Sequence, residues 1–108
     1  MSPRLDWTRT AVSNLDQIHS YLSSAAGEEI ARMVEGNIHD RVEELSEFPK
    51  QGRIVPELFR SDIREVFVRS FRIIYRIEPE DSPELISILG VAHPSQLLEN
   101  TGIFDILN

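Results

Sequence analysis

The chain has 108 residues, of which 41% are hydrophobic and 27% are charged, and its formal net charge is −7. This length fits one domain, and the composition is too apolar for an intrinsically disordered chain. No apolar run approaches the ~20 residues of a membrane span, and the first residues lack the apolar core of a secretory signal. There is no cysteine for a disulfide or a thiolate metal site. We therefore expect a soluble, single-domain, cytoplasmic protein.

The net charge hides an asymmetry along the chain. Residues 50–77 contain seven basic and three acidic side chains, whereas residues 23–49 carry −5 and residues 78–108 carry −6. An overall acidic protein is a poor general binder of nucleic acid. The basic middle indicates a local surface for anionic groups, or alternatively strand arginines that pair with nearby acids.

The first half of the sequence predicts a short strand and two helices. Residues 4–7 alternate polar and apolar side chains, as a half-buried strand does. Thr8 can cap a helix that the small residues 23–27 end, and a second helix is expected from Glu28 until the Phe48-Pro49 pair stops it. The apolar stripe of this second helix consists of Ile30, Val34, Ile38, Val42 and Leu45.

The second half predicts three strands. Residues 63–68 are rich in β-forming side chains, Arg69-Ser70 can form a tight turn, and residues 71–77 alternate clearly. Residues 85–91 are almost continuously apolar, which indicates a strand buried on both faces. The order β-α-α-β-β-β predicts an α+β domain, with a helical hairpin packed on one face of a small sheet.

The strand at residues 71–77 has two different faces. Its odd-numbered residues are Phe71, Ile73, Tyr75 and Ile77, which suit the face under the helices. Arg72 and Arg76 point to the opposite side, which we expect to be open. Among the sheet-face arginines, Arg64 and Arg72 can serve a partner or can pair with acids such as Glu65 and Glu78.

Particular stretches between residues 7 and 93 stand out in this order of elements. They are Trp7-Thr8-x-x-Ala11 with Leu15-x-x-Ile18-x-x-Tyr21, Leu45-x-x-Phe48-Pro49-x-x-Gly52-Arg53, Ile63-Arg64-Glu65-Val66, Phe71-Arg72-Ile73-Ile74-Tyr75-Arg76 and Val91-x-His93. Together, in this order and spacing, they resemble the RelE/ParE superfamily of toxins from type II toxin–antitoxin and plasmid-stabilisation systems.

The resemblance implies a RelE/ParE-like fold with a mainly antiparallel sheet, no cofactor, and a cognate antitoxin that wraps the toxin. RelE-like members cleave mRNA in the ribosomal A site without a metal, whereas ParE-like members inhibit DNA gyrase and do not cut RNA. The continuation Val55-Pro56-Glu57-Leu58 is more similar to the ParE branch.

If the chain is a nuclease, the resemblance makes Arg64, Arg72 and His93 the candidate catalytic residues. Metal-free RNA cleavage needs a base, an acid and cations for the developing charge. Arg64 and Arg72, with Arg53, can supply the cations, and His93 or Glu47 the acid or base. His93 alone is better explained as a structural residue at a strand end than as a catalyst.

Two departures favour the gyrase interpretation. Gln96 stands where the nuclease members often carry arginine, and the predicted second helix is acidic, which disfavours a site among ribosomal phosphates. The leading hypothesis is therefore a gyrase inhibitor rather than an enzyme. The alternatives are a ribosome-dependent mRNA endonuclease and an inactive homologue that binds the antitoxin.

Binding to the antitoxin or the target is expected at the basic residues Arg53, Arg64, Arg72 and Arg76. No metal site is expected, since the three histidines lack ligand spacing.

The last residues form a separate apolar segment. We expect residues 1–96 to be the toxin domain and residues 97–108 to be an apolar C-terminal tail. The tail either packs on its own sheet or contacts a partner, such as a second copy or gyrase.

Overall fold

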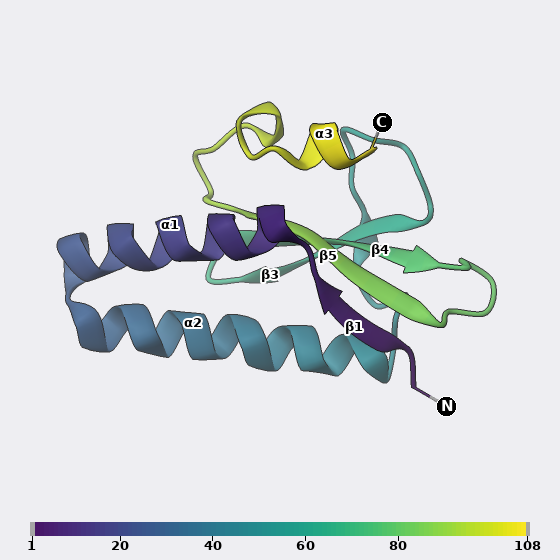
Figure 1. Cartoon of the computed structure of the whole chain (residues 1–108), viewed down its shortest axis with the longest axis horizontal. Coiled ribbons are helices and arrows are strands. Elements are labelled where there is room, and N and C mark those ends of the chain that lie inside the picture. Colours follow the sequence, from purple (N-terminus) through teal and green to yellow (C-terminus); the bar gives the residue numbers. More distant parts are fainter. Residues whose placement is uncertain (1, 108) are drawn as a thin grey trace.

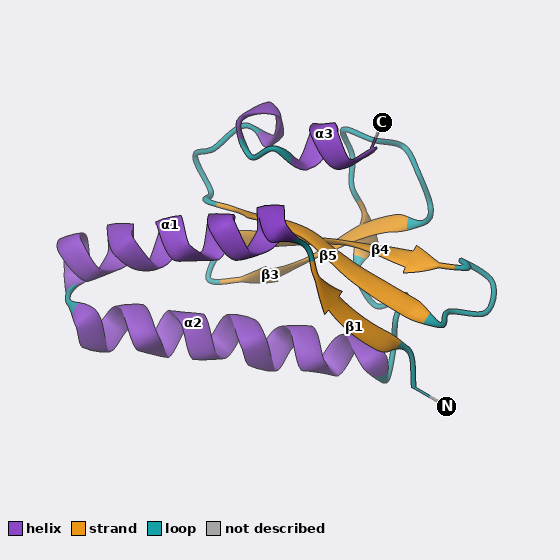
Figure 2. Ribbon diagram, in the orientation of Figure 1, coloured by secondary structure: helices purple, strands orange, loops and turns teal. Residues whose placement is uncertain are grey.

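The chain begins with a strand, continues through two long helices and ends in the rest of a five-stranded sheet with a short C-terminal helix (Figure 2). The computed structural model describes residues 2–107. The strands are β1 (Arg4–Trp7), β2 (Arg53–Ile54), β3 (Ile63–Val68), β4 (Phe71–Glu78) and β5 (Leu85–Ala92). The helices are α1 (Arg9–Ala26), α2 (Glu28–Glu43) and α3 (Ile103–Leu107), with 3-10 turns at η1 (Glu44–Ser46) and η2 (Leu98–Asn100). The expected α+β class is confirmed. None of the described helices is long and apolar enough to cross a membrane.

The sheet brings the first and last strands of the chain together. Its strand order is β1-β5-β4-β3-β2, with β1 parallel to β5 and the other neighbours antiparallel. The sheet is therefore mainly antiparallel, as expected. Figure 1 shows the first strand lying along the last one, and the two long helices side by side as a hairpin.

The start of α1 is fixed to the middle of the sheet. The Thr8 hydroxyl accepts a hydrogen bond from the Ala11 backbone N–H at 3.1 Å, so the predicted helix cap is confirmed. The same hydroxyl donates to the carbonyl of Ile88 in β5 at 2.7 Å. The helix then continues to Ala26, so the expected break over residues 23–27 is wrong except at Gly27. There φ is +100°, a value that glycine adopts without steric cost.

One face of the sheet packs against the helical hairpin, α1 on β5 and α2 on β3. The odd-numbered residues of β4 face this layer, as predicted. Ile30 is 38% exposed and Ala31 is buried instead, so the predicted stripe of α2 is wrong at its first position. The buried residues of this core include Leu15, Ile18, Val34, Ile38, Val42, Leu45, Ile73, Tyr75, Ile86 and Val91.

The other face of the sheet is not open, which corrects the sequence prediction. The C-terminal segment crosses it on the side away from α2 (Figure 1), and it forms a second core with the strands and the β2–β3 loop. This core contains Val55, Ile63, Ile74, Leu89, Ala92, Leu98 and Ile103. Of the two interpretations of the tail, packing on its own sheet is therefore the one observed for Leu98 and Ile103.

Gly90 makes room for the tail. The register of β4 and β5 shifts between Ile74 and Tyr75, and a Cβ built on Gly90 would lie 2.5 Å from the Ile103 side chain. The buried Asn14 of α1 secures the same place, since its amide accepts from the Val91 N–H and donates to the Thr101 carbonyl, both at 3.1 Å. The tail is thus bound to both the helix layer and the sheet.

We expect Ile103→Ala to destabilise the domain strongly, because Ile103 is fully buried against Gly90. Such a truncation costs about 2–5 kcal/mol, and each ~1 kcal/mol lowers the melting temperature of a domain this size by ~4–8 °C. The drop measured by calorimetry should therefore be at least about 8 °C. Leu97→Ala is the control, since Leu97 is 61% exposed. Equal melting temperatures for the two variants would contradict this role of the tail.

Candidate functional site

Arginines and glutamates of the tail-covered face form a network around one buried carboxylate. The Glu65 side chain has no solvent exposure, and it accepts hydrogen bonds from Arg53 Nε at 2.7 Å and from Arg72 Nε at 2.6 Å. The two terminal nitrogens of Arg72 donate to Glu57 at 2.8 and 2.9 Å. We call Glu65, Arg53, Arg72 and Glu57 the Glu65 network.

The strand register explains how this network forms. Arg53 lies opposite Glu65 in the pairing of β2 with β3. Arg72 lies opposite Phe67, two residues from Glu65 and therefore on the same face of the sheet. A buried carboxylate is tolerated only when charged hydrogen-bond donors neutralise it. Two strands on either side of β3 supply those donors.

The pairing also changes the acidity of the groups involved. Hydrogen bonds from Arg72 hold the pKa of Glu57 below its usual value of 4.5. Hydrogen bonds to Glu57, and then to Glu65, raise the pKa of Arg72 despite its partial burial. Both groups are therefore ionised at neutral pH, and the four charges of the network cancel.

A tight loop positions Arg53. The Tyr75 hydroxyl donates to the Pro49 carbonyl at 2.7 Å and accepts from the Gly52 N–H at 3.0 Å. Burial raises the pKa of Tyr75, which keeps the hydroxyl protonated. A Cβ on Gly52 would lie 2.5 Å from the Glu65 carbonyl oxygen. The Pro-x-x-Gly-Arg motif is thus a structural element that aims Arg53 at the buried carboxylate.

The structure does not bring Arg64 and Arg72 together. Arg64 alternates with Glu65 along β3, so its side chain leaves the opposite, helix-covered face. There its guanidinium donates to the carbonyls of Gly52 and Ser61, both at 3.1 Å. These two candidate cations of a nuclease site therefore point to different sides of the sheet.

His93 lies on the helix side, beyond the end of β5. Its ring centroid is 5.3 Å from that of Tyr21 and 5.5 Å from that of Phe71, both in edge-to-face geometry. Its Nδ1 is 2.9 Å from the Ser95 hydroxyl oxygen. The side-chain oxygen of Gln96 accepts from the His93 N–H, which closes the turn after the strand. These contacts support the interpretation of His93 as a structural residue.

Of the two remaining basic candidates, Arg76 lies outside the Glu65 network and Arg53 belongs to it. Arg76 Nε donates to Glu78 at 2.8 Å, so this arginine pairs with a nearby acid. Arg53 is 58% exposed at its side chain, and its guanidinium lies 5.1 Å from the centroid of the Phe67 ring. Phe67 is itself 44% exposed, so the sheet edge at β2 and β3 presents a cation beside an aromatic ring. The alternation of β3 could have located Phe67 on this face, but nothing in the sequence singled it out.

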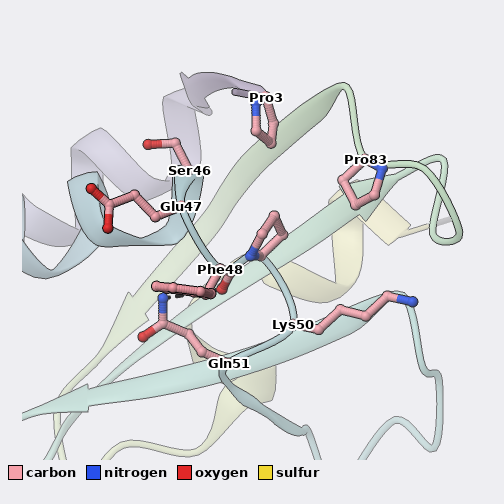
Figure 3. A pocket seen from close by; sticks show the side chains of 8 residues that line it. Pro3, Ser46, Glu47, Phe48, Lys50, Gln51 and Pro83 are labelled. Carbon is pink, nitrogen blue, oxygen red and sulfur yellow. Dashed lines mark hydrogen bonds between the residues drawn. The ribbon is translucent and has the colours of Figure 1, made fainter. Parts of the chain in front are cut away.

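Glu47 lines a different, mainly apolar groove of about 670 Å³ near the start of the chain. Figure 3 shows Pro3 and Pro83 on one side of it, and Phe48 and Lys50 on the segment that follows η1. The Phe48 ring is 68% exposed. Among the described residues that line this groove, none is a histidine or an arginine, so Glu47 lies apart from His93 and the candidate arginines. Within residues 2–107, no three carboxylate or histidine side chains are grouped as a metal would require.

Comparison with known proteins identifies the family. Residues 5–98 match the family described as "ParE toxin of type II toxin-antitoxin system, parDE". The chain is therefore a member of the ParE toxin family. A search of curated protein sequences finds no match.

Solved structures of toxin–antitoxin proteins share the fold. The chromosomal ParDE system of P. aeruginosa includes a chain with 24% identity and a TM-score of 0.69, with 85% of this chain and 96% of that chain covered. A mutant of E. coli toxin RelE in the free state has 15% identity and a TM-score of 0.63, covering 97% and 93%. The RelBE2 complex of Mycobacterium tuberculosis has 18% identity and a TM-score of 0.63, covering 86% and 99%.

We expect Glu57→Gln to lower stability in a pH-dependent way. A carboxylate whose pKa is depressed in the folded state stabilises the fold above its unfolded pKa and loses this effect as the pH falls through the folded value. At pH 7 the free energy of unfolding of the variant should be lower than that of wild type by less than about 1 kcal/mol, since the pair is partly exposed. Its melting temperature should be slightly lower for the same reason. The gap should close as the pH falls below 4.5. Glu44→Gln controls for net charge, and a gap that stays constant with pH would contradict the pairing.

Proposed function

We propose that this ParE-family toxin inhibits DNA gyrase through protein contact in the cytoplasm and is neutralised by a cognate antitoxin. The observation that carries the proposal is the separation of the groups an RNA-cleaving site would need. Arg64 and Arg72 leave opposite faces of the sheet, and His93 packs between two aromatic rings on the helix side.

The bonding of the candidate cations supports the same proposal. All three nitrogen atoms of the Arg72 guanidinium, Nε, Nη1 and Nη2, already donate hydrogen bonds to carboxylates. Arg64 donates to two backbone carbonyls. A phosphorane transition state needs cations whose donors are aimed at the reacting phosphate, and in the free chain these donors are aimed at the protein itself.

Surface charge adds a second line of support. The net charge of −7 and the acidic α2 disfavour entry into a cleft lined by ribosomal phosphates. A protein target requires only a local match of shape and charge. Arg53 with Phe67 at the sheet edge offers such a match to an acidic and apolar protein surface.

An antitoxin partner is supported by the matched family and by the related complexes, whose descriptions name toxin–antitoxin systems. We place its acidic contacts at the exposed basic residues beside the sheet, of which Arg53 is the most accessible member of the Glu65 network. Arg64 and Arg76 remain further candidates for contact with the antitoxin or the target.

The target is tested with purified components. We expect the toxin to abolish supercoiling by gyrase, with cleaved DNA accumulating, and to leave mRNA intact on programmed ribosomes. Arg72→Ala serves as the diagnostic variant in both assays. Cleavage of mRNA in the A site that disappears in this variant, with gyrase unaffected, would replace the proposal with the endonuclease. A folded protein that acts in neither assay would make it an inactive, antitoxin-binding homologue.

The antitoxin contact is tested by neutralising one exposed arginine. Arg53→Gln should weaken the complex with the protein encoded by the neighbouring reading frame by about tenfold, since it removes a charge from the interface while keeping a donor for Glu65. Arg32→Gln, on the exposed side of α2, changes the net charge equally and should bind as wild type does. Titration calorimetry measures both. Equal affinities would exclude Arg53 from the interface.

A further inference from the structure

Arg72 presents a complete carboxylate-binding fork that its own chain fills. On the buried side, Glu65 accepts a hydrogen bond from Nε of Arg72. The two outer nitrogens grip Glu57 in the bidentate geometry that guanidinium groups form with carboxylates. The Glu57 side chain is 44% exposed, so the outer half of this site faces solvent.

Glu57 belongs to a surface loop with an unfavourable backbone. The loop joins β2 to β3 and is anchored by the buried Val55, whose carbonyl accepts hydrogen bonds from the N–H groups of Leu58 and Phe59. Phe59 has φ of +53°, in the left-handed region that bulky side chains rarely adopt, and it is 88% exposed. The free chain therefore leaves a large aromatic ring in water, two residues from the carboxylate that fills the fork.

A small groove adjoins the same carboxylate. It has a volume of about 180 Å³ and is lined by Glu57 together with Leu97, Leu98, Glu99 and Phe104 of the C-terminal segment. Leu97 is 61% exposed at its edge. Apart from Glu99, the tail side of this groove is apolar, and Glu57 at its edge is held by Arg72. That combination matches a peptide segment in which a carboxylate is flanked by apolar side chains.

We propose that Glu57 is an exchangeable occupant of the Arg72 fork, which is a binding site for a glutamate or aspartate side chain of a partner protein. On binding, the partner carboxylate takes the two outer nitrogens, Glu57 moves out to solvent, and Glu65 keeps Arg72 in place. The identity of the partner as antitoxin or target rests on the proposed function, whereas the site itself does not.

In the free protein, Glu57 compensates the charge of Arg72 and keeps other carboxylates out of the fork. An empty Arg72 would leave the network with one uncompensated positive charge, and Glu57 cancels it. Glu57 is tethered close to the fork, so it competes with an effective concentration of at least about the millimolar range. Glu57 therefore outcompetes small free carboxylates for the fork. A partner protein that also covers Phe59 and the groove gains apolar burial that Glu57 does not provide.

The test uses the full chain labelled at arginine nitrogens, with the Nε and Nη signals of Arg72 followed by NMR. The probe is the blocked peptide acetyl-Leu-Glu-Leu-amide, with acetyl-Leu-Gln-Leu-amide as its uncharged match. The variants are Glu57→Gln and Glu57→Ala, and Glu44→Gln carries the same change in net charge at an exposed glutamate that pairs with Arg41.

We expect the acidic peptide to shift the Arg72 signals in both Glu57 variants at about tenfold lower concentration than in wild type or Glu44→Gln, as removal of a tethered competitor requires. The uncharged peptide should have no such effect. Glu57→Ala provides the same test if the amide of Glu57→Gln keeps its hold on the fork.

Three outcomes would overturn the proposal. The first is equal peptide binding by wild type and both Glu57 variants. The second is loss of the Arg72–Glu65 contact in both variants, which would make Glu57 a structural member of the network. The third is a response to inorganic phosphate stronger than to the peptide, which would assign the fork to a phosphate group. The first two outcomes bear neither on gyrase inhibition nor on the Arg53 contact, so they leave the proposed function standing. The third would also favour the endonuclease, and the gyrase assay then decides between the two functions.

Discussion

A carboxylate with no access to water sits under the edge of the sheet, and much of the local structure follows from the need to neutralise Glu65. Its two partners come from β2 and β4, the strands on either side, so the charge ties three strands together. β2 has only two residues, Arg53 and Ile54, and cannot be held by its backbone hydrogen bonds alone. The Arg53–Glu65 ion pair fixes the position of this edge strand, and the turn at Gly52 places Arg53 beside Glu65.

This arrangement gives the basic middle of the sequence a different meaning. The arginines that appear as a cationic surface in the sequence are largely engaged with glutamates and carbonyls of the same chain. Two specific features remain for contact with a partner. They are the exposed Arg53 guanidinium over the Phe67 ring and the Arg72 fork, which Glu57 occupies. Specific contact with another protein suits such a surface better than general attraction to a phosphate backbone.

The sequence predicts local features well and long-range ones poorly. The cap at Thr8, the alternation of β4 and the doubly buried β5 depend on periodicity and on single residue types, and they are confirmed. The covered second face was missed because it depends on the space over Gly90, which joins two segments distant in sequence. The small residues 23–27 predict a break, but only Gly27 has the backbone geometry for one.

The candidate site was predictable only in part. Pairing of Arg72 with Glu65 is among the predicted alternatives, because strand alternation brings these charges to one face. For Arg76 the sequence predicts only pairing with nearby acids in general, and the observed partner is Glu78. The role of Glu57 is not predicted, since a loop residue carries no periodicity. The separation of Arg64 from Arg72 follows from strand register, which composition and motifs do not specify.

The two crowded glycines have a genetic consequence. Neither Gly52 nor Gly90 has space for even a single added carbon, because backbone and side-chain atoms already lie 2.5 Å from where it would be. Every base change in a glycine codon that alters the protein either adds a side chain or stops translation. A cell can therefore escape its own toxin through a mutation at Gly52 or Gly90, even where these positions make no contact with a target. Such a mutation would prevent the close packing of the chain against Glu65 or against Ile103.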